Sequence, residues 1–142
     1  MQLTSQHLAE IVGALKKLEQ AGGHEKRRAT RMSVQANVSV STVVGGNIDR
    51  TFEAMTRDIS SQGIGLMQSL QMMSGQQFVV AFPREDRATL RFRIVTRHCR
   101  QLANGIYGIG GEFEEMIPDK MFEAMNNSPE AQMRRIQASI LG

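Results

Sequence analysis

From Met32 onward, apolar and polar residues alternate with a period of two, and this pattern constrains the fold more than any other feature of the chain. Between Met32 and Val40, valine and alanine alternate with serine, glutamine and asparagine. Successive side chains of a β-strand point to opposite faces, so the alternation predicts a strand with one buried face. Similar stretches predict further strands over residues 48–57, 64–68, 76–82, 87–100 and 106–113.

Short segments rich in glycine, proline or asparagine join these predicted strands. Gly45-Gly46-Asn47 and Asn104-Gly105 are typical of hairpin turns, and Pro83 opens another turn. Six or so short strands at roughly even spacing, joined in this way, predict an antiparallel barrel or sandwich rather than parallel βαβ units.

Helical patterns flank the strands at both ends of the chain. Residues 4–20 carry apolar side chains at spacings of three and four, which predicts an amphipathic helix that stops before Gly22-Gly23. After Pro118 we expect a short helix around residues 121–125. A final helix is expected from Ser128, because serine followed by proline is typical of a helix start.

The fold class predicted from these patterns is mainly β, with a barrel at its centre. We expect an N-terminal helix and linker over residues 1–24, the barrel over 25–117 and a helical segment over 118–142. A chain of 142 residues can bury a core without disulfides or metal. Cys99 is the only cysteine and no zinc-ligand spacing is present, which is typical of a reducing compartment. No apolar run reaches membrane-spanning length and the start does not resemble a signal peptide, so we expect a cytoplasmic protein.

The charged residues favour an anionic partner. Lys and Arg number 17 against 14 Asp and Glu, and thirteen of the 17 are arginine. The planar guanidinium group binds phosphate through two parallel hydrogen bonds and stacks on bases. The composition argues against long nucleic acid as the partner, because the chain has no dense basic run and only seven aromatic residues.

A cluster of basic residues stands just before the first predicted strand. In the segment Lys26-Arg27-Arg28-Ala29-Thr30-Arg31, the side chains of Arg27 and Arg31 can project toward one place. They would then form a clamp for phosphate oxygens or a purine face. The alternative is a solvated basic linker.

A second candidate element is the segment Asp58-Ile59-Ser60-Ser61-Gln62-Gly63, between two predicted strands. The carboxylate of Asp58 can accept two N–H bonds from the Watson–Crick edge of guanine, and the hydroxyl of Ser60 can donate to a phosphate. Gly63 lets the backbone approach a ligand closely. The alternative is a tight turn in which aspartate, serine and glycine serve only the backbone.

Together these two elements resemble the PilZ domain family. Arg27-x-x-x-Arg31 matches the RxxxR element of that family, and Asp58-x-Ser60-x-x-Gly63 matches its (D/N)xSxxG element. Tyr107-Gly108-Ile109-Gly110-Gly111-Glu112-Phe113 is similar to the closing strand of many members. The resemblance covers about residues 25–116 and implies a six-stranded barrel that binds the bacterial second messenger cyclic di-GMP through both motifs.

Three further groups of residues lie near these elements. Arg28 adjoins the clamp and Arg57 precedes the loop, so each is either an additional ligand contact or a surface residue. A row of arginines with a period of two is expected on the solvent face of the barrel, with one end able to reach the ligand: Arg87, Arg91, Arg93 and Arg97.

We expect no enzyme activity. Gly110-Gly111-Glu112-Phe113 resembles part of the diguanylate cyclase signature, but it closes an all-β region in a chain too short for that catalytic domain. His98 and Cys99 are neighbours on a predicted strand, so their side chains point to opposite faces and cannot form a nucleophile and base. No cofactor and no metal ligand set is predicted.

The sequence therefore predicts a cyclic di-GMP receptor that passes its signal to a protein partner of unknown identity by changing shape. The alternative is an interaction adaptor in which nucleotide binding is absent or secondary. The methionines of the C-terminal segment, Met121, Met125 and Met133, suit such an adaptor because they form adaptable apolar surfaces. We expect them instead to pack against the barrel.

Overall fold

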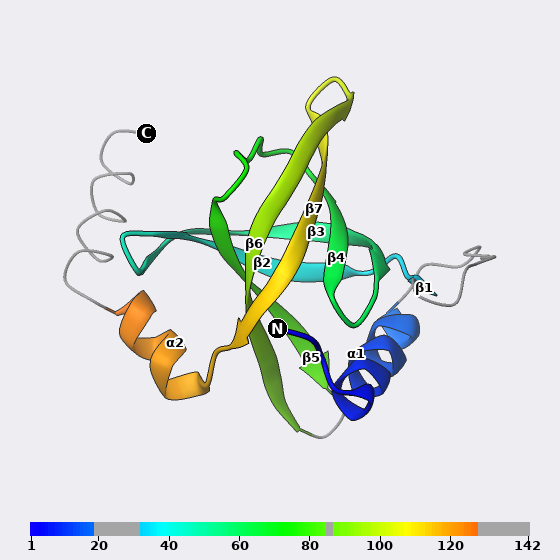
Figure 1. Ribbon diagram of the computed structural model, residues 1–142, viewed down its shortest axis with the longest axis vertical. Helices are drawn as coiled ribbons and strands as arrows, with labels where there is room; N and C mark the ends of the chain where they lie inside the picture. Colours follow the sequence, from blue (N-terminus) through cyan, green and yellow to red (C-terminus); the bar gives the residue numbers. More distant parts are fainter. Residues whose placement is uncertain (19–31, 85–86, 128–142) are drawn as a thin grey trace.

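The computed structural model describes residues 1–18, 32–84 and 87–127, in which strands dominate (Figure 1). In chain order the elements are α1 (Ser5–Leu18), β1 (Met32–Ser33), β2 (Asn37–Val44), β3 (Asn47–Ile59), β4 (Gly63–Gln68), β5 (Gln77–Arg84), β6 (Arg87–Ala103), β7 (Ile106–Met116) and α2 (Asp119–Asn126). The helix predicted from Ser128 lies outside the described residues.

The six longer strands close into a barrel. Their hydrogen-bonded order is β3-β2-β5-β6-β7-β4, and a further pairing of β4 with β3 completes the ring. All pairings are antiparallel, and the two-residue β1 adds to β3. The predicted six-stranded antiparallel barrel, with an N-terminal and a C-terminal helix, is confirmed.

Glycines with positive φ make the tight connections between consecutive strands. Gly45 and Gly46, at φ of 60° and 82°, join β2 to β3, and Gly105, at φ of 74°, joins β6 to β7. Two-residue hairpins favour such angles because they match the twist of the flanking strands. Both hairpins were predicted from these glycines and are present.

The first predicted strand is interrupted at the point where the side chain of Thr56, and not only the backbone of β3, forms hydrogen bonds with its backbone. The hydroxyl of Thr56, which is fully buried, accepts the N–H of Ala36 at 3.0 Å and donates to the carbonyl oxygen of Val34. Ser33 lies opposite Asp58 and Asn37 opposite Met55, so three residues face two. This extra residue separates β1 from β2, although the alternation of buried and exposed side chains continues through the gap.

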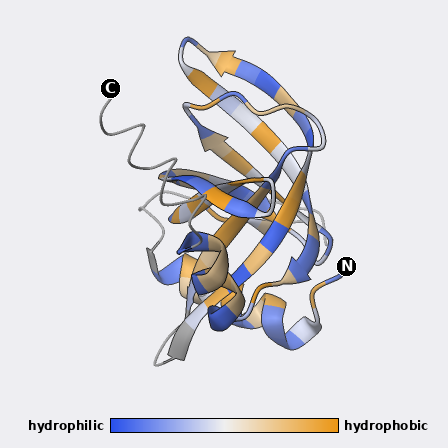
Figure 2. Cartoon of the chain, turned by 90° about the vertical axis from the view of Figure 1, so that its left-hand side faces the viewer, coloured by the Kyte–Doolittle hydropathy of each residue, from blue (hydrophilic) through white to orange (hydrophobic). Residues whose placement is uncertain are grey.

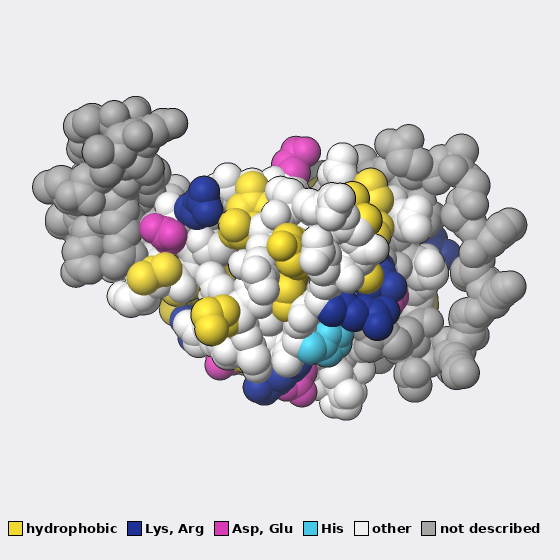
Figure 3. Space-filling view, turned by 90° about the horizontal axis from the view of Figure 1, so that it is seen from above, with side chains coloured by type: hydrophobic (Ala, Val, Ile, Leu, Met, Phe, Trp, Pro, Cys, Tyr) yellow, Lys and Arg dark blue, Asp and Glu magenta, His cyan; other side chains and the backbone are white. Residues whose placement is uncertain are grey.

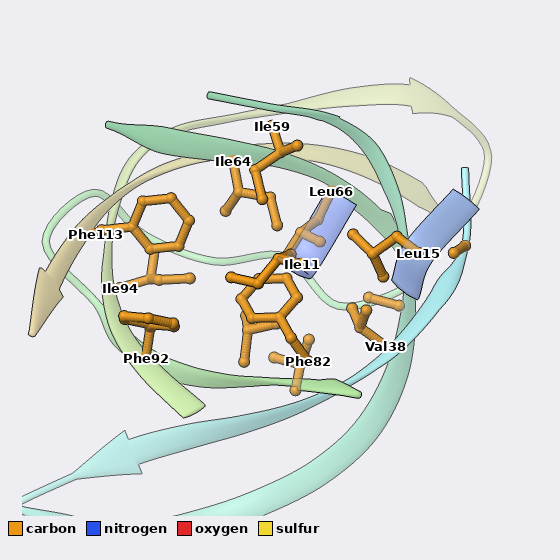
Figure 4. Packing of buried hydrophobic residues seen from close by; sticks show 14 of the residues in the cluster. Ile11, Leu15, Val38, Ile59, Ile64, Leu66, Phe82, Phe92, Ile94 and Phe113 are labelled. Atoms are coloured by element: carbon orange, nitrogen blue, oxygen red, sulfur yellow. The ribbon is translucent and has the colours of Figure 1, made fainter. Parts of the chain in front are cut away.

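Inward-facing side chains fill the barrel, and Figure 2 shows hydrophobic and hydrophilic residues alternating along its strands. The rings of Phe82, Phe92 and Phe113 pack with centroids 5.5 to 6.4 Å apart, within the range that aromatic pairs favour. Helix α1 adds Ile11 and Leu15, both fully buried and pointing into this core (Figure 4). The apolar stripe predicted for the N-terminal helix therefore packs on the barrel.

Helix α2 packs on the outside of the barrel in a smaller cluster. Met125 is buried there, and the ring of Phe122 packs against the same cluster and beneath the guanidinium of Arg91, 4.3 Å away. Arg91 also forms an ion pair with Asp119 at 2.8 Å. Of the three methionines proposed for an adaptor surface, Met125 thus packs on the barrel, Met121 is exposed, and Met133 lies outside the described residues.

Candidate functional site

The loop between β3 and β4 is held together by the side chain of Ser60. Its Oγ accepts the N–H groups of Gln62 and Gly63 at 3.2 Å each, while its own N–H donates to the carbonyl oxygen of Gly63 at 2.9 Å. Ser60 is buried, so the hydroxyl serves the turn, as serine often does. Its contact with a phosphate stays a prediction.

The close approach of strand β7 explains why residue 63 is a glycine. A Cβ at this position would collide with the carbonyl oxygen of Gly111. Gly63 is not among the described glycines with positive φ, so close strand approach, and not turn conformation, requires the glycine here. The loop is anchored on two sides, because Leu3 donates to the carbonyl oxygen of Ser61 at 2.7 Å and Phe113 to that of Gln62 at 3.0 Å.

Asp58 belongs to a row of four residues that crosses four neighbouring strands. Asp58 on β3 lies opposite Gly65 on β4, Gly65 opposite Gly110 on β7, and Gly110 opposite His98 on β6. A Cβ on Gly65 would lie 2.8 Å from Oδ1 of Asp58, and one on Gly110 would meet the imidazole of His98. The two adjacent glycines therefore form a floor, and the Asp58 carboxylate and the His98 imidazole lie over it from opposite sides.

Two β-bulges frame this floor. One lies on β3 between Thr56 and Asp58, and the other on β6 between Thr96 and His98. A bulge adds one residue to a strand and redirects the side chains that follow. If side chains alternated strictly between the two faces of β6, Arg97 would face outward and His98 would face the barrel interior. The bulge instead leaves both side chains exposed on the outer surface.

Two adjoining hollows occupy the outer surface around this row. The first, of about 490 Å³, is lined by Arg57, Asp58, Gly65, His98, Arg100, Gly108, Ile109 and Gly110. The second, of about 380 Å³, is lined by Ser60, Gln62, Gly63, Ile64, Arg97, His98, Gly110, Gly111 and Glu112. His98 and Gly110 line both hollows. In Figure 3, basic side chains and a histidine gather at one side of the face seen from above.

The structure brings together four of the predicted site residues. Asp58 and Arg57 line the first hollow, and Ser60 and Gly63 line the second. The arginines predicted ahead of the barrel, Arg27, Arg28 and Arg31, lie outside the described residues.

Three basic residues that line the hollows are not among the predicted site residues: Arg97, His98 and Arg100. Arg97 was expected only as the end of a solvent-facing row. The signal available in the sequence was the pair of consecutive polar residues at 97 and 98, which breaks the alternation of β6. The other described side chains of the row, Arg91 and Arg93, form ion pairs with Asp119 and with Glu114 and Glu115.

Within residues 1–18, 32–84 and 87–127, no three His, Cys, Asp or Glu side chains cluster as a metal site would require. Over the same residues, no helix is both long enough and apolar enough to cross a membrane.

The model of the PilZ domain matches residues 25–127, which is most of the chain. The chain belongs to the PilZ domain family. The match includes the strands that form the barrel, both hollows and the two motifs that the sequence pattern had singled out. No curated protein matches the chain.

Two solved structures are similar to this PilZ protein. One is the inhibitor of motility MotI/DgrA of Bacillus subtilis, at 14% identity and a TM-score of 0.47, with 84% of this chain and 54% of that chain covered. The other is MrkH of K. pneumoniae in its apo state, at 11% identity and a TM-score of 0.45, with 85% and 53% covered. This chain therefore spans about half the length of each.

Proposed function

We propose that this PilZ protein is a receptor for cyclic di-GMP and has no chemistry of its own. The observation that carries the proposal is the row from Asp58 to His98, in which a carboxylate and an imidazole lie over two adjacent glycines on the outer surface. This row lies beside the motif loop of a family whose members include receptors for this nucleotide.

The ligand and the hollows have complementary chemistry. Cyclic di-GMP carries two phosphodiesters and two planar guanines. The carboxylate of Asp58 can accept the N1–H and N2–H of a guanine. The missing side chains of Gly65 and Gly110 let the carboxylate and the neighbouring imidazole lie close to the backbone, so that both line the hollow. Arg57 and Arg100 line the same hollow and supply cations for a phosphate.

Arg27 and Arg31 complete the proposed site from the segment before β1. We expect each guanidinium to donate to a phosphate or to stack on a guanine. A charge-assisted hydrogen bond contributes about 1.5–3 kcal/mol, so Arg27→Ala or Arg31→Ala should weaken binding between about tenfold and a hundredfold.

Calorimetry with cyclic di-GMP tests this function, because it reports affinity and stoichiometry together. The wild type, Arg27→Ala and Arg31→Ala would be titrated beside Arg50→Ala, which removes an exposed arginine from the β3 segment next to the β2–β3 turn. We expect binding by the wild type and Arg50→Ala, and strong loss in the other two variants. Absence of binding by the wild type would refute the receptor function.

We further propose that the bound state is read by a protein partner. The loop that carries the motif is hydrogen-bonded to Leu3, two residues before the start of α1, and α1 is packed in the barrel core. A ligand that shifts this loop can therefore shift α1. This contact supports a change of shape as the output of binding.

A further inference from the structure

Arg97 occupies the bulge of β6 and lines the hollow that also contains Ser60 and Gly63. Its Nε lies 2.5 Å from Oε1 of Glu112, and both side chains are more than half exposed, at 58% and 53%. Glu112 lies directly opposite Gly63 on the neighbouring strand. An anionic group therefore already contacts the arginine at the place where the second hollow opens.

An exposed ion pair of this kind is weak, because water screens both charges and both side chains lose freedom when they pair. A phosphodiester can accept two parallel N–H bonds from the planar guanidinium, as a carboxylate can. A phosphodiester held in the hollow by other contacts would compete with Glu112 for Arg97. The carboxylate would then lie next to the anion that displaced it.

Arg93 provides an informative contrast on the same strand. It is paired with Glu114 at 3.0 Å and also with Glu115, its side chain is 21% exposed, and Glu114 additionally accepts a hydrogen bond from Gln77 at 3.0 Å. None of these four residues lines either hollow. The Arg93 cluster thus holds three strands together, whereas the Arg97–Glu112 pair lies at the candidate site.

We propose that Glu112 is an internal competitor for the ligand, which holds Arg97 in the free protein and releases it to a phosphate on binding. The inference rests on the proposed function and names two residues that set its affinity. Arg97 becomes a phosphate-binding residue, and Glu112 lowers the affinity for any anion that enters the second hollow.

The test is a double-mutant cycle measured by calorimetry with cyclic di-GMP at low salt. We expect Glu112→Gln to tighten binding between about twofold and fivefold, and Arg97→Gln to weaken it about tenfold. In the Arg97→Gln background, Glu112→Gln should have no effect, because there is no guanidinium left to release. Glu114→Gln is the matched control, since it removes the same charge two residues away and should leave affinity unchanged.

A second readout follows the Arg97 side chain itself. The Nε–Hε resonance of Arg97 should move when cyclic di-GMP is added to the wild type, and in the same direction when Glu112→Gln is made without ligand. The proposal is overturned if Glu112→Gln fails to tighten binding. It is also overturned if Glu112→Gln still tightens binding in the Arg97→Gln variant. If the wild type binds cyclic di-GMP and both single variants bind it with the same affinity, only this inference is refuted. A wild type that does not bind refutes the proposed function and the inference with it.

Discussion

Asp58 and the glycine opposite it show how single atoms define the proposed site. The carboxylate of Asp58 leans over Gly65, where any Cβ would lie within 2.8 Å of Oδ1. The imidazole of His98 leans over Gly110 in the same way from the other side. The positions of the Asp58 and His98 side chains therefore depend on the absence of side chains at residues 65 and 110.

Asp58→Ala should remove the recognition of guanine more than the attraction to phosphate. The wild type is expected to prefer cyclic di-GMP over cyclic di-AMP, because the adenine edge presents a different donor pattern. In Asp58→Ala this preference for cyclic di-GMP should largely disappear. The control is Glu53→Ala, which removes an exposed acid from the same strand and should keep the preference. Competition titrations measure it. Equal affinity of the wild type for both nucleotides would show that Asp58 does not read the base.

Gly65→Ala should weaken cyclic di-GMP binding about tenfold, the effect of losing roughly one charge-assisted hydrogen bond. The new methyl group would force the Asp58 carboxylate away from its place over residue 65, so the group proposed to accept the guanine N–H bonds would be displaced. Calorimetry is again the measurement. Gly13→Ala is the matched control, because a Cβ at that position on α1 meets nothing within 4 Å. Wild-type affinity in Gly65→Ala would mean that the ligand does not use the floor.

Among the elements, β6 and α1 contribute most to the position of the site. The bulge of β6 turns Arg97 and His98 outward together, while residues 90, 92 and 94 of the same strand stay inside. Helix α1 fills part of the interior with Ile11 and Leu15, and Leu3, two residues before the helix, is hydrogen-bonded to the motif loop. The loop between β3 and β4 therefore lies between the barrel core and the candidate site.

Leu15→Ala should destabilise the protein by about 2–5 kcal/mol, because a fully buried leucine leaves a cavity when it is truncated. Lys16→Ala, the adjacent exposed position, should change the free energy of unfolding by no more than about 0.5 kcal/mol. Urea unfolding followed by circular dichroism measures both. A small effect of Leu15→Ala would mean that α1 contributes little to the barrel core in solution.

At the scale of the whole molecule, a ligand that binds only the folded state stabilises it by mass action. Cyclic di-GMP at about one hundred times its Kd should add about 2.7 kcal/mol to the free energy of unfolding and raise the melting temperature. Arg31→Ala should show a much smaller increase at the same concentration. Thermal unfolding with and without ligand measures this effect. An unchanged melting temperature in the wild type at saturating ligand would contradict the receptor function.

Residue patterns along the chain were sufficient to predict the barrel and to nominate part of the candidate site. The alternation of apolar and polar residues and the conformations of turn glycines depend on residues that are close in the sequence. The strands, the hairpins at Gly45-Gly46 and Gly105, and the buried face of α1 could therefore be predicted from short stretches of sequence. The motif residues of the β3–β4 loop were likewise recognised from their spacing alone.

Only the tertiary structure decided what surrounds Asp58. Strand order places β7 between β4 and β6, and this brings Gly110 beside Gly65 and His98 beside Gly110 although they are far apart in the sequence. The bulge at Arg97 depends on how β6 pairs with β7, so it reverses the face that simple alternation assigns to His98. Local periodicity determines which residues form strands, whereas the pairing register between strands determines which side chains meet.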